Sequence, residues 1–278
     1  MKYSYITLLT NDNYFQGVVL LNETLRKVKS KYPLICMITE DISQDIKSLL
    51  VKLGVIVKEI DKVVINNNLI EHNKSIDESQ ATVWENVYSK FRMFDFEEYD
   101  KLIFLDADLL ILKNIDDYFE KPSGTAAEDG EYFNLWPKDL HFNSGFFIFK
   151  PDKNITQDLI NFINTVNPKE FLSYKGEEII IGDQDVLNVY FKDWEQNKEL
   201  HLDKYNNVFT PYITYDNEDD ILSNSYFLHY VGVKPWQALN DKEMIYTTKG
   251  VNNSSFLAYE LGHAVISYVY INGIRNID

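Results

Sequence analysis

The chain has 278 residues, of which 45% are hydrophobic and 25% charged, and it carries one cysteine and a formal net charge of −16. This hydrophobic content excludes a disordered chain and suits one large α/β domain. The single Cys36 excludes a disulfide framework and a cysteine-based zinc cluster, and it suits a reducing compartment. The 43 acidic against 27 basic residues argue against nucleic acid and anionic membranes as main partners.

The N-terminal part of the chain alternates predicted strands with predicted helices. Short apolar runs predict buried strands over residues 5–9, 34–38 and 55–60. Between them, apolar residues at helical spacing predict helices over residues 18–28 and 46–53. This alternation predicts parallel strands joined by right-handed helical crossovers, as in one half of a Rossmann-like fold.

The middle of the chain is less regular. Residues 62–80 are mostly polar and predict a loop, and helical spacing resumes over residues 83–94. The most strongly buried predicted strand covers residues 101–105, and a second apolar strand covers residues 146–149. Residues 159–166 again have helical spacing.

No Gly/Ser-rich or Pro-rich linker divides the chain, so we expect one catalytic domain over residues 1–240, with residues 241–278 packed on it as a C-terminal extension. The apolar stretch Phe256–Ile271 is interrupted by Glu260 and His263, so no membrane span is predicted. The N-terminus lacks the features of a signal peptide. The expected location is the cytoplasm, or a host cytoplasm or virion if the Asn-, Ile-, Lys- and Tyr-rich composition reflects a low-GC viral genome.

The sharpest chemical signal is Asp106-Ala107-Asp108, directly after the predicted strand over residues 101–105. Open α/β sheets bind ligands at the carboxyl ends of such strands. In an extended segment both carboxylates would point the same way, and no basic residue stands beside them in the sequence. Two unpaired carboxylates there are costly, and one divalent cation would relieve that cost. The alternative is a turn that contains two aspartates by chance.

A second signal is the segment His229–Trp236. A histidine can complete an Asp/Asp metal site, Gly232 would let the backbone approach a phosphate, and Lys234 would supply positive charge to it. An isolated histidine is more often structural or exposed, so His229 gains meaning only from the motifs that accompany it.

Five motifs occur in a set order along the chain. They are Thr7–Tyr14, Leu105–Asp108, His141–Phe146, Gly182–Asn188 and His229–Trp236. Together they resemble the glycogenin-like retaining glycosyltransferases of glycosyltransferase family eight, from about Tyr5 to Trp236.

The resemblance implies an α/β fold of the single-domain GT-A type, a Rossmann-like nucleotide-sugar transferase with a mixed central sheet. It implies a UDP-sugar donor and Mn²⁺, with Mg²⁺ as the alternative ion, held by Asp106, Asp108 and His229. Lys90, Asp183 and Gln184 would form the catalytic set near the transferred sugar. The residues implied to bind the donor are Leu8, Thr10, Asn11, Tyr14, Asn86, Ala107, Asn143, Ser144, Gly232 and Lys234.

The implied activity is that of a retaining hexosyltransferase with UDP-glucose as the first choice of donor. Glycogenins glycosylate one of their own tyrosines, and Tyr212 or Tyr215 would be that acceptor here. A separate glycan or small molecule is the alternative acceptor, and the chain would act alone or as a homodimer. Whether Asp183 is a covalent nucleophile or only positions the acceptor stays open.

Three positions depart from the family pattern. Lys234 follows Gly232 after one residue instead of two, Ile180 stands where many members have an aspartate, and Ala81 stands where an arginine is expected. The sugar, the acceptor and the linkage therefore stay open. Two other classes are retained: a haloacid-dehalogenase-type phosphatase, which shares the strand and DxD pattern, and a non-catalytic carbohydrate- or nucleotide-binding relative.

The net charge sets a requirement that does not depend on the family. An acidic protein that releases UDP must stabilise two phosphates locally, because its overall field repels them. A divalent cation together with Lys234 would supply that stabilisation.

Overall fold

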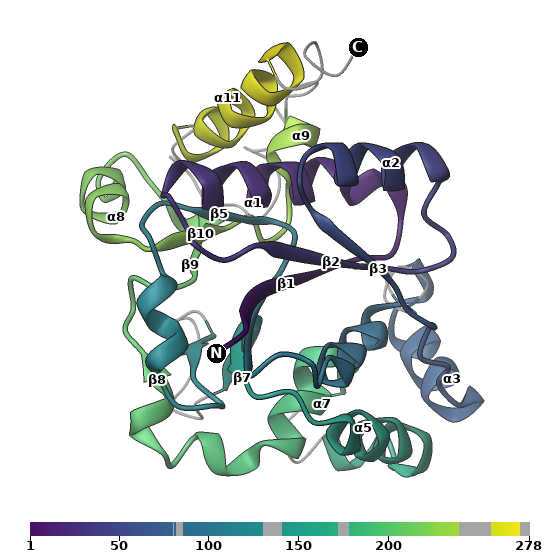
Figure 1. Cartoon of the computed structure of the whole chain (residues 1–278). Coiled ribbons are helices and arrows are strands. Elements are labelled where there is room, and N and C mark those ends of the chain that lie inside the picture. The colour runs from purple at the N-terminus through teal and green to yellow at the C-terminus, as the bar shows by residue number, and fades with distance from the viewer. Residues whose placement is uncertain (80, 82–85, 130–140, 172–177, 239–256, 273–278) are drawn as a thin grey trace.

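The computed structural model describes residues 1–79, 81, 86–129, 141–171, 178–238 and 257–272. Within these residues the α/β fold contains one large sheet, with strand order β3-β2-β1-β4-β7-β6-β8, and one small sheet, with order β5-β10-β9 (Figure 1). The strands are β1 (Tyr3–Leu9), β2 (Leu34–Ile38), β3 (Ile56–Glu59), β4 (Lys101–Leu105), β5 (Leu109–Ile111), β6 (Ala126–Glu128), β7 (Phe142–Phe149), β8 (His201–Leu202), β9 (Val208–Phe209) and β10 (Phe227–His229).

Helices connect and cover these strands. The α-helices are α1 (Phe15–Lys27), α2 (Gln44–Lys52), α3 (Asn67–Ile76), α5 (Lys153–Thr165), α7 (Asp183–Tyr190), α8 (Glu218–Asn224), α9 (Pro235–Ala238) and α11 (Leu257–Asn272). The 3₁₀-helices are η1 (Asp12–Tyr14), η2 (Val87–Asp95), η3 (Asp116–Glu120), η5 (Lys192–Trp194), η6 (Lys198–Leu200) and η7 (Thr210–Tyr212).

The N-terminal half of the large sheet is parallel, as predicted. Strand β1 lies between β2 and β4, with Tyr5 opposite both Leu34 and Ile103. Helices α1 and α2 make the crossovers on one side of these strands, and α3, α5 and α7 lie on the other (Figure 1). Neighbouring residues Tyr5 and Ile6 are both fully buried, in the cores on opposite sides of the sheet. Burial on both faces explains why these strands are continuous apolar runs.

Strand β7 makes the sheet mixed. It runs antiparallel to β4, with Leu105 opposite Phe146, and β6 pairs antiparallel on its other side. All eight residues of β7 are buried, and the strand begins at Phe142, earlier than the predicted residues 146–149. The polar residues near its start concealed this part of the strand from the apolar pattern.

The small sheet brings the end of the chain to the DxD motif. Strand β10 pairs antiparallel with β5, with His229 opposite Leu109, and it pairs parallel with β9. Because β5 begins directly after Asp108, this register places His229 beside both aspartates.

The predicted loop over residues 62–80 is wrong, because helix α3 lies within it. The Asn66 side chain caps this helix by accepting a hydrogen bond from Leu69 N at 2.9 Å. Only Leu69 and Asn73 of α3 are buried, so its inward face is half polar and gives little apolar periodicity. The helix predicted over residues 83–94 is described from Val87 onward, where it is a 3₁₀-helix, and residues 82–85 lie outside the described residues.

Helix α11 belongs to the predicted C-terminal extension and packs against α1 and α9 (Figure 1). Tyr230 Oη donates a hydrogen bond to the Ala258 carbonyl at 2.7 Å. The boundary predicted at residue 240 falls among residues outside the described part of the chain. None of the helices among the described residues has the length and hydropathy needed to cross a membrane.

Candidate active site

The DxD motif forms a turn at the carboxyl end of β4. Asp106 N donates to the Gly145 carbonyl at 2.8 Å, and Leu109 N donates to the Asp106 carbonyl at 3.2 Å. The expectation of an extended segment is therefore wrong, and a turn brings the two carboxylates together. Gly145 permits this close approach, since an added Cβ would lie 2.7 Å from His229 Cε1 and 2.9 Å from Asp106 Oδ2.

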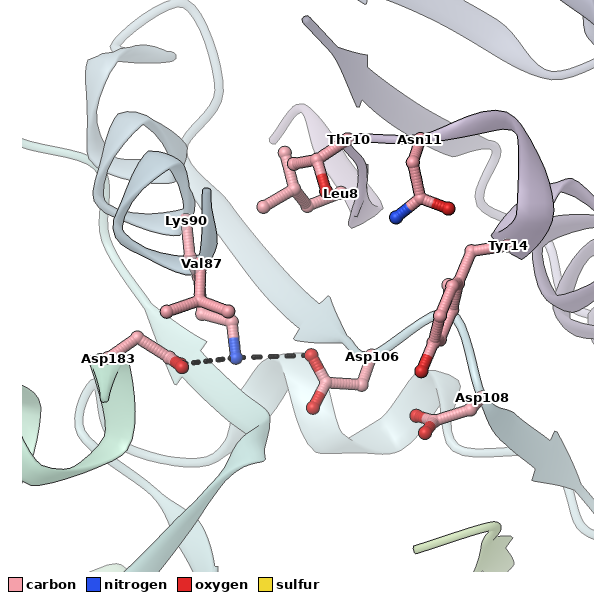
Figure 2. A pocket seen from close by; sticks show the side chains of 10 residues that line it. Leu8, Thr10, Asn11, Tyr14, Val87, Lys90, Asp106, Asp108 and Asp183 are labelled. Atoms are coloured by element: carbon pink, nitrogen blue, oxygen red, sulfur yellow. Dashed lines mark ion pairs between the residues drawn. The ribbon is translucent and has the colours of Figure 1, made fainter. Parts of the chain in front are cut away.

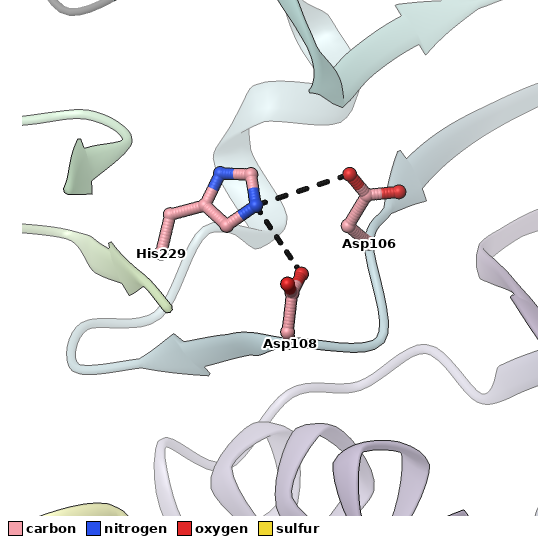
Figure 3. Close-up of side chains that lie close together, drawn as sticks. All are labelled: Asp106, Asp108 and His229. Atoms are coloured by element: carbon pink, nitrogen blue, oxygen red, sulfur yellow. Dashed lines mark ion pairs between the residues drawn. The ribbon is translucent and has the colours of Figure 1, made fainter. Parts of the chain in front are cut away.

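Asp106, Asp108 and His229 form the predicted cluster (Figure 3). One donor atom from each lies within 4.8 Å of the others. His229 Nε2 is 3.2 Å from Asp108 Oδ1 and 3.9 Å from Asp106 Oδ2. Two carboxylates and one imidazole nitrogen suit Mn²⁺, and the oxygen-rich set also accommodates Mg²⁺. The residues therefore fit the implied divalent ion.

Two buried lysines contact these carboxylates, although neither is near them in the sequence. Lys90 Nζ lies 3.1 Å from Asp106 Oδ1 and 2.5 Å from Asp183 Oδ2. Lys234 Nζ lies 2.5 Å from Asp108 Oδ2. The expectation that the aspartates lack basic partners is therefore wrong, because η2 and the segment after β10 supply them through tertiary packing. Three carboxylates against two ammonium groups still leave an excess of negative charge for a cation.

The pKa values follow from burial and from these ion pairs. Burial raises the pKa of Asp106 above its usual value, and Lys90 offsets this only in part. Burial also acts to raise the pKa of Asp108, but the opposing contacts, with the Lys234 ammonium first among them, hold that pKa well below its usual range. Burial acts to lower the pKa of Lys90, and Asp106 and Asp183 overcome this effect and raise it. Asp108 likewise raises the pKa of Lys234 against its burial, so both lysines stay charged.

The predicted sugar-side residues form one hydrogen-bond network. Ser144 Oγ donates to Asp183 Oδ2 at 2.8 Å and accepts from Lys90 Nζ at 3.1 Å. Gln184 Oε1 accepts from Ser144 N at 3.1 Å and from Asn143 Nδ2 at 2.9 Å. Strand β7 and the start of α7 hold these groups, so the predicted set meets from two distant parts of the chain.

Asp129 belongs to this network and was missed by sequence reasoning. Its carboxylate accepts from Asn143 Nδ2 at 3.2 Å and from Gln184 Nε2 at 3.0 Å. Asp129 follows the short strand β6, in a region without apolar periodicity, so the sequence held no signal for it. The pairing of β6 with β7 brings it to the site.

A cavity of about 230 Å³ opens between these groups (Figure 2). Figure 2 shows Lys90 between Asp106 and Asp183 on one side of the cavity, with Tyr14 and Asp108 on the other. All but Val87 of the lining residues were predicted as donor, metal or catalytic residues. They are Leu8, Thr10, Asn11, Tyr14, Val87, Lys90, Asp106, Ala107, Asp108 and Asp183.

The remaining predicted donor residues are not among those that line this cavity. Asn86 precedes Val87 in the chain and is partly buried. Gly232 has φ of +85°, a conformation that favours glycine. The Tyr14 ring meets Trp236 edge-on, with ring centroids 5.8 Å apart, and lies 5.7 Å from Lys234 Nζ.

The two predicted acceptor tyrosines are not among the residues that line the cavity. Tyr212 ends η7 and is partly buried, and its carbonyl accepts from Asn217 Nδ2 at 3.3 Å. Tyr215 is 57% exposed.

The mixed α/β sheet, with Asp106 and Asp108 after β4 and His229 at the end of β10, has the GT-A fold of solved glycosyltransferases. The chain belongs to glycosyl transferase family 8, whose sequence pattern matches residues 5–240. This membership leaves the phosphatase alternative without support. A likeness to the galactosyltransferase LgtC, solved in complex with donor and acceptor sugar analogues, covers 90% of this chain and 97% of LgtC, with a TM-score of 0.58 at 15% identity.

Two kinds of curated relative are similar to this chain in sequence. Galactinol synthase 1 of Solanum lycopersicum is 33% identical over 208 residues, which cover 68% of this chain and 60% of that protein. Glycogenin-1 of Caenorhabditis elegans is 31% identical over 240 residues, which cover 85% of this chain and 51% of glycogenin. The chain thus spans about half to three fifths of the length of these two relatives.

Proposed function

We propose that this protein transfers a hexosyl group from a UDP-hexose to a hydroxyl acceptor, with retention of configuration and with the help of a divalent cation. The observation that carries the proposal is the Asp106–Asp108–His229 cluster beside the cavity, bridged to Asp183 by Lys90. The same cavity contains the residues that the family resemblance assigns to the nucleoside, at the end of β1.

Different side chains of this protein would bind the nucleoside and the diphosphate of the donor. Leu8, Thr10, Asn11 and Tyr14 would hold the nucleoside, while Lys234 and Gly232 would meet the diphosphate. When bound, Mn²⁺ or Mg²⁺ supplies positive charge that stabilises the departing UDP. Lys234 adds a fixed positive charge at the same place, because burial and Asp108 keep its position defined.

On the sugar side, Asp183 would stabilise the positive charge that develops on the sugar ring. Lys90 and Ser144 both contact its Oδ2 atom and hold the carboxylate in one orientation. Gln184 and Asn143 would bind the hydroxyl groups of the sugar, and Asp129 orients both amides. This division of roles is compatible with Asp183 as a nucleophile and with a same-face substitution.

For the donor sugar we retain glucose as the first candidate and galactose as the second, which the likeness to galactinol synthases favours. For the acceptor we place a separate polyol or glycan first, which the likeness to galactinol synthases favours, ahead of self-glycosylation of Tyr212 or Tyr215. Self-glycosylation would take place within one copy of the chain or between the two copies of a homodimer. The cytoplasm remains the proposed location, since Cys36 is a buried free thiol.

The test is UDP release and intact mass, measured with UDP-glucose or UDP-galactose, Mn²⁺ and a panel of polyols and glycans. We expect release to need the divalent ion, and Asp108→Asn to lower it about 100-fold or more. Asp117→Asn, which changes an exposed aspartate, is the matched control.

Each outcome of this assay has a distinct meaning. An added hexosyl mass on the protein, absent in Tyr212→Phe, would restore self-glycosylation as the main reaction. Unchanged release after chelation of the metal would contradict the metal assignment. A lack of release with every UDP-hexose and acceptor would reject the transferase proposal.

A further inference from the structure

The imidazole of His229 is held on its Nδ1 side, away from the two aspartates, by a buried asparagine. His229 Nδ1 lies 2.8 Å from Oδ1 of Asn207, which is 3% exposed. The Phe209 ring meets the imidazole edge-on, with centroids 5.6 Å apart at 84°. These two contacts leave Nε2 as the ring nitrogen that faces Asp106 and Asp108.

This contact determines which nitrogen of the ring carries the proton. The Asn207 carbonyl oxygen can only accept, so Nδ1 must be the N–H that donates to it. In the neutral imidazole the lone pair is then on Nε2, and only a lone pair can bind a cation. The opposite tautomer would turn an N–H toward the two carboxylates and close the site to a metal.

The backbone at Asn207 has an unusual conformation. Its φ of +63° lies in the left-handed region, which asparagine tolerates better than most residues. The preceding Asn206 fixes the turn by donating from its backbone and its side chain to Asp203. Among the described residues, Asn207 Nδ2 is buried without a hydrogen-bond partner. An amide that leaves a buried donor unpaired is poorly suited to a purely structural role.

We propose that Asn207 is a positioning residue of the metal site, which holds His229 in the tautomer and orientation that bind a divalent cation. This inference rests on the proposed function, because it assumes that Asp106, Asp108 and His229 bind the ion. Partners of this kind behind a metal-binding histidine contribute about 10- to 100-fold to metal affinity.

The test is the Kd for Mn²⁺ without nucleotide, measured by electron paramagnetic resonance of the free ion. Asn207→Gly removes the side chain and keeps the left-handed backbone free of strain, and we expect its Kd to rise about 10- to 100-fold. Asn207→Asp keeps an acceptor for Nδ1–H and should bind Mn²⁺ at least as tightly as the unchanged protein. Asn22→Ala is the matched control, since this buried asparagine donates to the Leu53 carbonyl and should change stability alone.

The outcomes separate this inference from the proposed function. If Asp108→Asn loses Mn²⁺ while Asn207→Gly binds it as tightly as the unchanged protein, the role of Asn207 is rejected and the metal site stands. If Asp108→Asn also keeps Mn²⁺, or the unchanged protein does not bind it, the metal assignment and this inference are both overturned. Should Asn207→Gly fail to fold, the ¹⁵N NMR spectrum of the unchanged protein with bound Mg²⁺ decides, because an unprotonated Nδ1 of His229 would refute the inference.

Discussion

At the scale of single residues, several buried carboxylates contact hydrogen-bond donors or ammonium groups that lie far away in the sequence. Asp106 and Asp108 do so with lysines in the active site. Asp116 does so in the core, where it accepts from Tyr5 Oη at 2.8 Å, Ser30 Oγ at 2.7 Å and Lys31 N at 2.9 Å. A buried carboxylate surrounded by donors stabilises the fold only while it is ionised.

Asp116→Asn tests this at a position that does not line the cavity. Burial acts to raise the pKa of Asp116, but its hydrogen bonds outweigh burial and lower it. A depressed folded-state pKa contributes stability that is present above the unfolded value, about 4, and is lost as the pH falls through the folded value. We expect Asp116→Asn to lose about 1–3 kcal/mol of unfolding free energy at pH 7 and less at pH 2.

Denaturant unfolding at both pH values measures this difference. Asp117→Asn, at the exposed neighbouring position, should change neither value. An equal loss for Asp116→Asn at pH 7 and pH 2 would show that ionisation of Asp116 does not contribute.

At the scale of elements, helix α3 positions the segment that carries Asp183. The buried Asn73 side chain makes two hydrogen bonds to the backbone of Ile181. Its Nδ2 donates to the Ile181 carbonyl and its Oδ1 accepts from the Ile181 N–H, at 3.0 Å each. Tyr88 Oη donates to the same carbonyl at 2.5 Å. Helix α7 begins two residues later at Asp183, so these contacts set where the carboxylate lies.

Asn73→Ala should therefore affect the sugar side of the site more than the metal side. Losing the contacts to Ile181 would shift Asp183, and a displacement of about 1 Å can lower the rate about 100-fold. We expect kcat to fall about 10- to 100-fold while the Kd for Mn²⁺ stays unchanged.

Steady-state kinetics with the active UDP-hexose and metal titration give these two quantities. Asn68→Ala, on the exposed face of the same helix, is the matched control. A parallel loss of metal affinity, or an unchanged kcat, would contradict a role for Asn73 in placing Asp183.

At the scale of the whole molecule, the net charge of −16 opposes the binding of any nucleoside diphosphate. The lysines at the site are also paired with aspartates, which offsets part of their positive charge. Binding of UDP should therefore be strongly coupled to a divalent cation, more than in a protein with a basic surface.

Calorimetry of UDP binding with Mn²⁺ and with EDTA measures this coupling. We expect Mn²⁺ to tighten UDP binding by a factor of about 5 to 150, and UDP to tighten Mn²⁺ binding by the same factor. KCl at equal ionic strength is the control, because screening of the overall field alone should recover only part of the affinity. Equal UDP affinity in EDTA and in Mn²⁺ would contradict the coupling.

The sequence alone determined the parts of this protein that depend on local pattern. Residues 34–38 were predicted as a strand and form β2, and residues 101–105 were predicted as a buried strand and form β4. Apolar periodicity is set by neighbours along the chain, so it can be read without the fold. The order of the motifs likewise indicated the family and most residues of the cavity.

Only the tertiary structure decided what depends on contacts between distant segments. Lys90 and Lys234 pair with the DxD aspartates, and Asp129 joins the sugar-side network. Asn207 contacts Nδ1 of His229. A lone charged or amide residue carries no periodic signal, and its partner is chosen by strand register and helix packing. The sequence could therefore supply the chemistry of the site, whereas its electrostatic balance and the orientation of its histidine required the folded chain.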